Sequence, residues 1–257
     1  MKLFDLTGKV AVVTGASSGL GADAAVAYAE AGADVALLAR RKERLEEVAE
    51  RIRKTGHKAI AIACDVADEE NVKVAVEEVF NHFGKIDILL NNAGIAIGGS
   101  VETLEQKDWD KIMDINVKGI YLMCKYVIPH MRKQKYGRIV NVSSINAFVA
   151  DKSPLLVRHV YNTSKAAVTG LTMGMAASYG VDGITVNSIA PGLFESEMTE
   201  DTLFKAIDFL NMYNALTPVG RPGAKGELNG TIIYFSSDAA SYVTGQHVIV
   251  DGGFSIV

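Results

Sequence analysis

The chain has 257 residues, 49% of them hydrophobic and 22% charged, with a formal net charge of −4. This composition suits a globular fold with a large core, and the absence of a basic block argues against nucleic acid and anionic membrane partners. No apolar run is long enough to span a bilayer and no secretory leader is evident, so we expect a cytoplasmic protein with no membrane contact.

Two cysteines, Cys64 and Cys124, are too few for a disulfide framework and are expected to be reduced structural thiols. The five histidines are scattered, with no close pair at the spacing of metal ligands. The sequence therefore predicts no metal site.

Short apolar strands alternate with helical stretches along the chain. We expect strands at residues 10–14, 34–38, 59–64, 86–90, 138–142, 184–189 and 247–250. Helices are expected from the glycine-rich turn to residue 31, and at residues 41–55, 68–83, 108–133, 160–179, 200–216 and 226–236.

This alternation implies parallel strands joined by right-handed helical crossovers. The strands are continuously apolar, as in a sheet that is covered on both faces. No linker or internal repeat interrupts the series. We therefore predict an α/β fold: a single doubly wound Rossmann-type domain over residues 1–257, with about seven parallel strands and helices on both faces.

A glycine-rich turn, T-G-A-S-S-G-L-G, lies between the first strand and the first helix. Its spacing is not the commoner G-x-G-x-x-G, but glycines at this place let a pyrophosphate approach the backbone at the positive end of the helix. We expect a dinucleotide to be held by Gly15, Ser17, Ser18, Gly19, Leu20 and Gly21.

The end of the second strand reads Leu38-Ala39-Arg40-Arg41. An acid there would accept hydrogen bonds from the adenosine ribose of NAD, whereas a guanidinium can bind a 2′-phosphate. Arg40 therefore predicts NADP(H) rather than NAD(H). The alternative is that Arg40 and Arg41 merely begin a solvated helix and pair with acids such as Glu43.

Tyr161 and Lys165 are four residues apart in a predicted helix, so they share one face. The pKa of a free tyrosine is about 10, too high for a base at neutral pH. A nearby ammonium, together with an oxidised nicotinamide ring, would lower it. The Y-x-x-x-K pattern is common by chance, so its context decides what it means.

That context resembles the short-chain dehydrogenase/reductase family over essentially the whole chain. The segments that carry the resemblance occur in the family's order: Thr14–Gly21, Asp65-Val66, Asn91-Asn92-Ala93-Gly94, Asn116, Ser143-Ser144, Tyr161-x-x-x-Lys165 and Pro191-Gly192. The resemblance implies an NAD(P)-dependent oxidoreductase that acts on CH–OH groups, and a homotetramer.

The resemblance also implies catalytic roles. Tyr161 would be the general acid in reduction and the base in oxidation, and Ser144, rather than Ser143, would hold the reacting oxygen. Lys165 would bind the nicotinamide ribose and lower the pKa of Tyr161. Asn116 would support a water-linked proton path from Lys165, although a structural amide that kinks a helix is the alternative.

The remaining family positions would contact the cofactor. Asp65 and Val66 would frame the adenine, and Asn92, Ala93 and Gly94 would line the adenosine and ribose. An alternative for Asn91 and Asn92 is that they brace the central strands. The carboxamide and phosphates would be held by Pro191, Gly192, Phe194 and Ser196, the last a departure from the family's usual threonine.

Two segments are expected to contact the substrate. Ser144 and Tyr161 are further apart than is usual in the family, and the extra residues, 151–159, either shape the pocket or form a neutral insertion. Within them, Arg158 and His159 either bind a carboxylate or phosphate of the substrate or are simply solvated. A second wall is expected from apolar side chains in residues 193–216: Phe194, Met198, Leu203, Phe204, Phe209, Met212 and Tyr213.

The sequence thus predicts hydride transfer between NADP(H) and a small ketone or secondary alcohol. Members of the gluconate 5-dehydrogenase type, which act on sugar acids or polyols, look most similar; 3-oxoacyl thioester reductases and hydroxysteroid dehydrogenases are the alternatives. A non-catalytic cofactor-binding regulator would be expected to have lost Ser144, Tyr161 or Lys165, and a methyltransferase would not need the tyrosine–lysine pair. A tetramer interface would use apolar residues on the long helices: Ile120, Met123, Val127, Met173 and Met175.

Overall fold

The computed structural model describes residues 2–150, 156–196, 199 and 203–257. Within them, one seven-stranded parallel sheet has the order β3-β2-β1-β4-β5-β6-β7. The strands are β1 (Val10–Thr14), β2 (Asp34–Ala39), β3 (Ala59–Ala63), β4 (Ile88–Asn91), β5 (Gly137–Val142), β6 (Ile184–Pro191) and β7 (His247–Val250). The expected Rossmann-type fold class is confirmed. The order reverses between β1 and β4, and the carboxyl edge at such a switch point is where ligands bind in this architecture.

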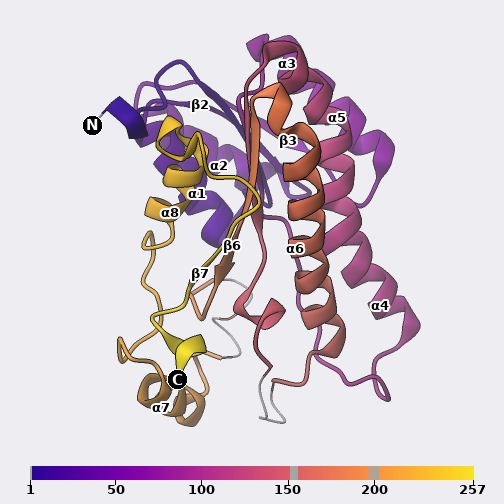
Figure 1. Cartoon of the computed structure of the whole chain (residues 1–257), viewed down its shortest axis with the longest axis vertical. Coiled ribbons are helices and arrows are strands. Elements are labelled where there is room, and N and C mark those ends of the chain that lie inside the picture. The colour runs from indigo at the N-terminus through magenta and orange to yellow at the C-terminus, as the bar shows by residue number, and fades with distance from the viewer. Residues whose placement is uncertain (1, 151–155, 197–198, 200–202) are drawn as a thin grey trace.

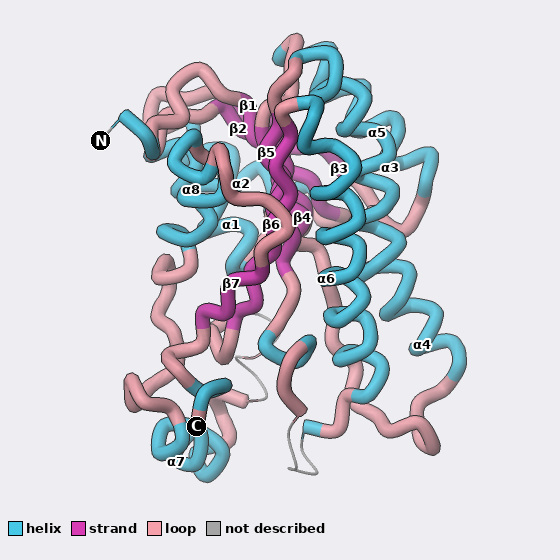
Figure 2. Tube along the Cα trace, in the orientation of Figure 1, coloured by secondary structure: helices cyan, strands magenta, loops and turns pink. Residues whose placement is uncertain are grey.

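Helices cover both faces of the sheet (Figure 1). One layer holds α1 (Gly19–Glu30), α2 (Lys42–Arg53) and α8 (Asn229–Ser236), and the other holds α3 (Glu69–Phe83), α5 (Gly119–Gln134) and α6 (His159–Tyr179). Each layer packs its apolar face on the sheet and so forms its own buried cluster. Figure 2 shows the strands edge-on between these layers, with α7 (Ile207–Leu216) beyond the carboxyl edge.

Several predicted boundaries were wrong. The long helix expected at 108–133 consists of α4 (Gln106–Met113), a π-helical turn (Asp114–Lys118) and α5. The helix expected at 200–216 begins at Ile207 among the described residues, and 200–202 lie outside them. The helix expected at 226–236 begins at Asn229, because Gly226 has φ +85°, outside the right-handed helical region.

The apolar residues expected at a tetramer interface mostly serve the core of this chain. Ile120, Met123, Val127 and Met175 are buried, whereas Met173 is 53% exposed. Their apolar character is therefore explained without a second subunit. Among the described residues, no helix combines the length and apolarity needed to cross a membrane.

Candidate active site

A cavity of about 1370 Å³ lies at the carboxyl edge of the sheet. Its wall combines the glycine-rich turn after β1, the ends of β2, β3, β5 and β6, and the first turns of α6. Every residue that the sequence predicted for catalysis or cofactor binding lines this cavity except Gly21 and Asn116, which are both buried. Residues from seven separate segments are thus brought to one place.

The glycine-rich turn is held closed from behind by Asn92. The Nδ2 amide of Asn92 donates to the carbonyl oxygens of Thr14 (3.1 Å) and Gly15 (3.2 Å). A Cβ at Gly21 would lie 2.4 Å from this amide nitrogen, so Gly21 permits the packing without lining the cavity. Asn92 braces the turn as the alternative interpretation proposed, and it lines the cavity as well.

Helix α1 begins at Gly19 on the cavity wall, and Ser18 makes no side-chain cap. The N–H groups of a first helical turn have no partner within the helix, so they are available to an anion. This donor set fits a diphosphate.

Both arginines after β2 line the cavity. Arg40 is exposed, and the Nη2 of Arg41 donates to the hydroxyls of Ser17 (3.2 Å) and Ser18 (3.3 Å). Arg41, which was not among the predicted site residues, therefore lies against the glycine-rich turn beside Arg40. Its place directly after Arg40 was the signal that could have found it.

Helix α6 places Tyr161 and Lys165 on the cavity wall, with exposed fractions of only 8% and 5%. The Nζ of Lys165 lies 5.8 Å from the centre of the Tyr161 ring and donates to the carbonyl of Val142 (2.9 Å). The two serines differ: Ser143 Oγ donates to the carbonyl of Lys165 (2.9 Å), whereas Ser144 Oγ bonds to Asn146 (3.2 Å). Ser143 thus has a structural partner in the helix, and Ser144 keeps a local one.

Burial dominates the titration of this pair. Burial raises the pKa of Tyr161 above its ordinary value, while Ser144 and then Arg158 act in the opposite direction. Burial also lowers the pKa of Lys165 to about 8. The expectation that Lys165 lowers the pKa of Tyr161 also invoked a bound oxidised nicotinamide, so it stays a prediction for the complex with the cofactor.

Asn116 is fully buried in the π-helical turn. Its Oδ1 accepts from Ile95 N (2.8 Å), and its Nδ2 donates to Ile95 O (2.9 Å) and Ser164 Oγ (3.0 Å). A Cβ at Gly94 would lie 3.3 Å from Asn116 Oδ1 and 3.4 Å from Lys165 Nζ, so the amide is close to the lysine. Both interpretations, a structural amide and a support for proton transfer, fit this place.

The neighbouring residues Arg158 and His159 differ in their position relative to the cavity. Arg158 lines the cavity and is half-buried. His159 is exposed, and its Nδ1 accepts from the N–H of Val101 (3.1 Å). Of the extra segment, residues 151–155 lie outside the described residues.

The predicted apolar wall is largely present. Leu203, Phe209, Met212 and Tyr213 line the cavity, Phe204 packs beside them without lining it, and Met198 lies outside the described residues. Sequence reasoning missed further lining residues: Thr199, Leu216, Phe254, Ser255 and Val257. Nothing local in the sequence marks the last three, because only the fold returns the chain's end to the cavity.

The cysteines carry no reactive signature. Cys64 lines the cavity and Cys124 is buried beside Asn91, and burial raises the pKa of both thiols to about 12. Both are therefore protonated at neutral pH. In the described part of the chain, no group of three or more histidine, cysteine or acidic side chains could hold a metal ion.

Comparison with known proteins finds close similarity over the whole chain. A model of the family described as short chain dehydrogenase matches residues 9–205. Gluconate 5-dehydrogenase of Gluconobacter oxydans is 39% identical over 254 residues, covering 99% of this chain and 97% of that enzyme. The 3-oxoacyl-[acyl-carrier-protein] reductase of Staphylococcus aureus is 37% identical over 246 residues, covering 95% and 97%.

A solved structure gives the same result. Gluconate 5-dehydrogenase of Burkholderia cenocepacia, in complex with NADP and tartrate, superimposes with a TM-score of 0.94 at 35% identity and covers 100% of this chain and 98% of that one.

Proposed function

The chain belongs to the short-chain dehydrogenase/reductase family of NAD(P)-dependent oxidoreductases acting on CH–OH groups, and from this premise we propose that it transfers a hydride between NADP(H) and a sugar acid or polyol. One observation carries the proposal. A single cavity is lined both by the glycine-rich turn with its two arginines and by Ser144, Tyr161 and Lys165.

The preference for NADP(H) rests on charge. No acid stands at the end of β2, where Ala39 occupies the cavity wall, and Arg40 and Arg41 follow it there. Arg40 would pair with a 2′-phosphate, and Arg41 would share it with the Ser17 and Ser18 hydroxyls that it already contacts. The relative from Burkholderia cenocepacia was solved with NADP.

The other residues predicted for cofactor binding would hold the rest of the dinucleotide. The pyrophosphate would lie on the first turn of α1, at Gly19 and Leu20, with Ser196 beside Gly19. The adenosine would contact Asp65, Val66, Asn92, Ala93 and Gly94, and the carboxamide would contact Pro191, Gly192 and Phe194.

The chemistry follows from the side chains at the other end. Bound nicotinamide supplies the hydride in reduction and accepts it in oxidation. Tyr161 Oη would donate a proton to the carbonyl oxygen in reduction and take it back in oxidation, and Ser144 Oγ would donate a hydrogen bond to that oxygen. Because its pKa is raised by burial, Tyr161 is protonated at neutral pH, as a proton donor must be.

Lys165 would bind the nicotinamide ribose, and Asn116 would hold the backbone at Ile95 that borders this lysine. All four proposed catalytic residues are intact, which favours an enzyme over a non-catalytic regulator.

The relatives support two substrate classes. Gluconate 5-dehydrogenases favour a sugar acid or polyol, and 3-oxoacyl-[acyl-carrier-protein] reductases favour a 3-oxoacyl thioester. We place the sugar acid first because of the cation at the substrate end, Arg158. We further propose one catalytic domain and a homotetramer, which gel filtration with light scattering would test.

The proposed function is tested by titrating protein fluorescence with NADPH and with NADH, then assaying 5-ketogluconate, an acetoacetyl thioester, ketosteroids and diketones with the preferred cofactor. We expect tighter NADPH binding and turnover of 5-ketogluconate. Arg40→Ala and Arg41→Ala should each weaken NADPH binding about tenfold and leave NADH binding unchanged. Equal losses for both cofactors would refute the 2′-phosphate contact, and failure to bind either would support a scaffold.

A further inference from the structure

We propose that Arg158 is the carboxylate-binding residue of the substrate site, so that the enzyme selects hydroxy acids and keto acids over neutral polyols of the same carbon skeleton. This inference rests on the proposed function and names the substrate class of the same site. It assigns a role to Arg158 alone among the residues between Ser144 and Tyr161.

The charges around the cavity favour an anionic substrate. Among the described lining residues the cations are Arg40, Arg41, Arg158 and Lys165, and Asp65 is the one acid. The two arginines after β2 serve the cofactor end, and Lys165 is buried and bonded to the Val142 carbonyl. Arg158 is thus left as the cation available to a substrate, in a protein whose net charge is −4.

The backbone of Arg158 is fixed on both sides. Gly99 N donates to the carbonyl of Val157 (2.8 Å), and His159 N donates to the carbonyl of Gly99 (3.3 Å), which together form an isolated parallel bridge. The carbonyl of Arg158 accepts from Asn162 N (2.9 Å) in the first turn of α6. A guanidinium on such a clamped backbone can hold an anion in one orientation, as selective binding requires.

The guanidinium of Arg158 lacks the partner that other arginines of this fold have. Arg53, Arg132, Arg138 and Arg221 each form an ion pair with an acidic side chain. In the described residues no acid pairs with Arg158, and the first turn of α6 contains none. A half-buried cation without a counter-charge is costly, and a carboxylate ligand would offset this cost through a bidentate contact.

Arg158 is also close enough to the reacting group for one small molecule to reach both. Arg158 is the N-cap residue of α6, Tyr161 lies in the first turn of that helix, and both line the cavity. A short hydroxy acid could therefore present its hydroxyl to Tyr161 while its carboxylate meets Arg158. A phosphate would satisfy the same cation, so the test must separate the two anions.

The test compares gluconate with sorbitol in the oxidation direction with NADP+. The two molecules differ in having a carboxylate or a CH2OH group at C1. We expect Arg158→Gln to raise KM for gluconate on the order of 10- to 100-fold and to leave kcat/KM for sorbitol within about twofold. Arg158→Lys should recover part of the loss, and Arg51→Gln, an exposed charge change on α2, should have no effect. Added inorganic phosphate should compete with gluconate only weakly.

A binding measurement keeps the inference separate from turnover. Isothermal titration of the NADPH-saturated protein with gluconate, a pair that cannot exchange a hydride because both are reduced, should show binding that Arg158→Gln weakens at least about tenfold. Unchanged binding, or equal losses for gluconate and sorbitol, would overturn the proposal. No turnover of any carbonyl, with gluconate binding still dependent on Arg158, would refute the proposed function and keep this inference.

Discussion

A cation is buried at the amino edge of the sheet, where the parallel strands begin, and another at the carboxyl edge, where they end. The surroundings of the two cations differ. At the amino edge, Arg138 is the second residue of β5, is 5% exposed and is surrounded by acceptors. At the carboxyl edge, Lys165 is equally buried and donates to one backbone carbonyl, that of Val142. The difference separates a charge that stabilises the fold from a charge that is available for chemistry.

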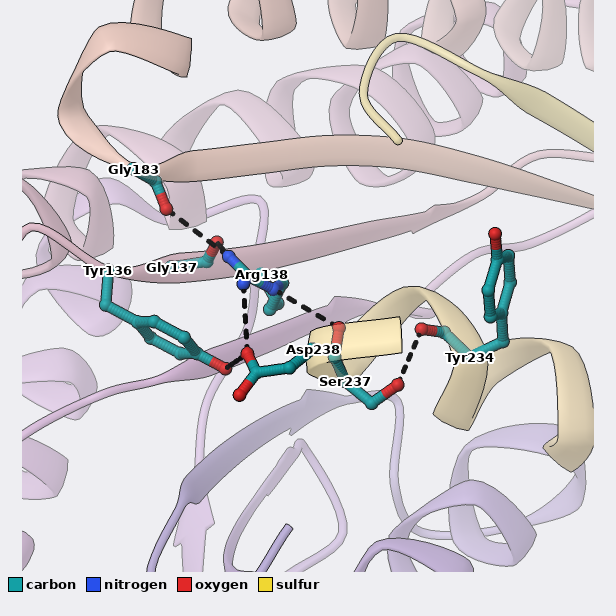
Figure 3. A network of polar contacts seen from close by, with 7 residues as sticks. All are labelled: Tyr136, Gly137, Arg138, Gly183, Tyr234, Ser237 and Asp238. Carbon is teal, nitrogen blue, oxygen red and sulfur yellow. Dashed lines mark hydrogen bonds and ion pairs between the residues drawn. The ribbon is translucent and has the colours of Figure 1, made fainter. Parts of the chain in front are cut away.

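Figure 3 shows how the amino edge holds its arginine. The guanidinium of Arg138 bonds to the carbonyls of Gly137 (2.9 Å), Gly183 (3.3 Å) and Ser237 (3.4 Å), and it pairs with Asp238 (3.1 Å). The ring of Tyr136 lies 4.3 Å from it and donates its hydroxyl to the same carboxylate. These contacts tie β5 to Gly183, just before β6, and to Ser237 and Asp238, just after α8.

The same edge pairs its other buried charges. Asp182 is bonded to Arg132 (2.7 Å) and Lys135 (2.6 Å), and Asp87 to Lys85 (2.9 Å). At the carboxyl edge, by contrast, Lys165 has a lowered pKa and Tyr161 a raised one. Tyr161 and Lys165 line the cavity at this edge, whereas Arg138, Asp182 and Asp87 do not, so their perturbed pKa values point to a functional site at the carboxyl edge.

The largest effect is expected from a substitution at the carboxyl edge. Tyr161→Phe should lower kcat on the order of 10²- to 10⁴-fold, because the proton donor is removed while the ring still packs. Stopped-flow or steady-state assays measure kcat, and fluorescence titration should show unchanged cofactor binding. Tyr179→Phe, at the other end of α6, is the matched control. Turnover within about threefold of wild type would remove Tyr161 from the proposed chemistry.

The next largest effect is expected from a substitution at the amino edge. Arg138→Met should lower the free energy of unfolding by about 2–4 kcal/mol, because several buried acceptors lose their donor. Chemical denaturation measures the loss, and kcat per folded molecule should change less than twofold. A large loss of kcat with unchanged stability would show that the two edges are not separable.

The pH dependence of stability sharpens the contrast. The pKa of Lys165 is about 8 in the folded protein and about 10.4 when unfolded, so the unfolded chain binds more protons between these values. Burying the charged lysine therefore lowers the free energy of unfolding by its full amount below pH 8, and this loss disappears as the pH rises from about 8 to about 10.4. Relative to Lys165→Met, the wild type should gain roughly 2 kcal/mol between pH 8 and 10. A flat difference in denaturation midpoints would contradict an unpaired Lys165.

The smallest effect tests which acceptors hold Arg138. The Asp238 side chain is 56% exposed, so Asp238→Asn, which keeps an oxygen acceptor, should cost only about 1 kcal/mol or less. Thermal and chemical denaturation at low and high salt measure it. A loss as large as that of Arg138→Met would assign the stabilisation to the carboxylate instead of to the carbonyls.

Local sequence patterns predicted much of the fold. Continuous apolar runs located all seven strands, and apolar residues at helical spacing located most of the helices. The predicted helix boundaries were wrong where no local sequence pattern marks the end of a helix. The π-helical turn around Asn116 depends on hydrogen bonds to Ile95, a partner 21 residues away.

The sequence by itself determined the order of strands and helices and the motifs that they carry, because periodicity, glycine turns and i, i+4 spacing are local properties. Only the tertiary structure decided which side chains meet. It placed Arg158 on the cavity and turned His159 to Val101, laid Arg41 against Ser17, and paired Arg138 with Asp238, 100 residues away. Burial and charge pairing are set by contacts between distant segments, and no local pattern encodes them.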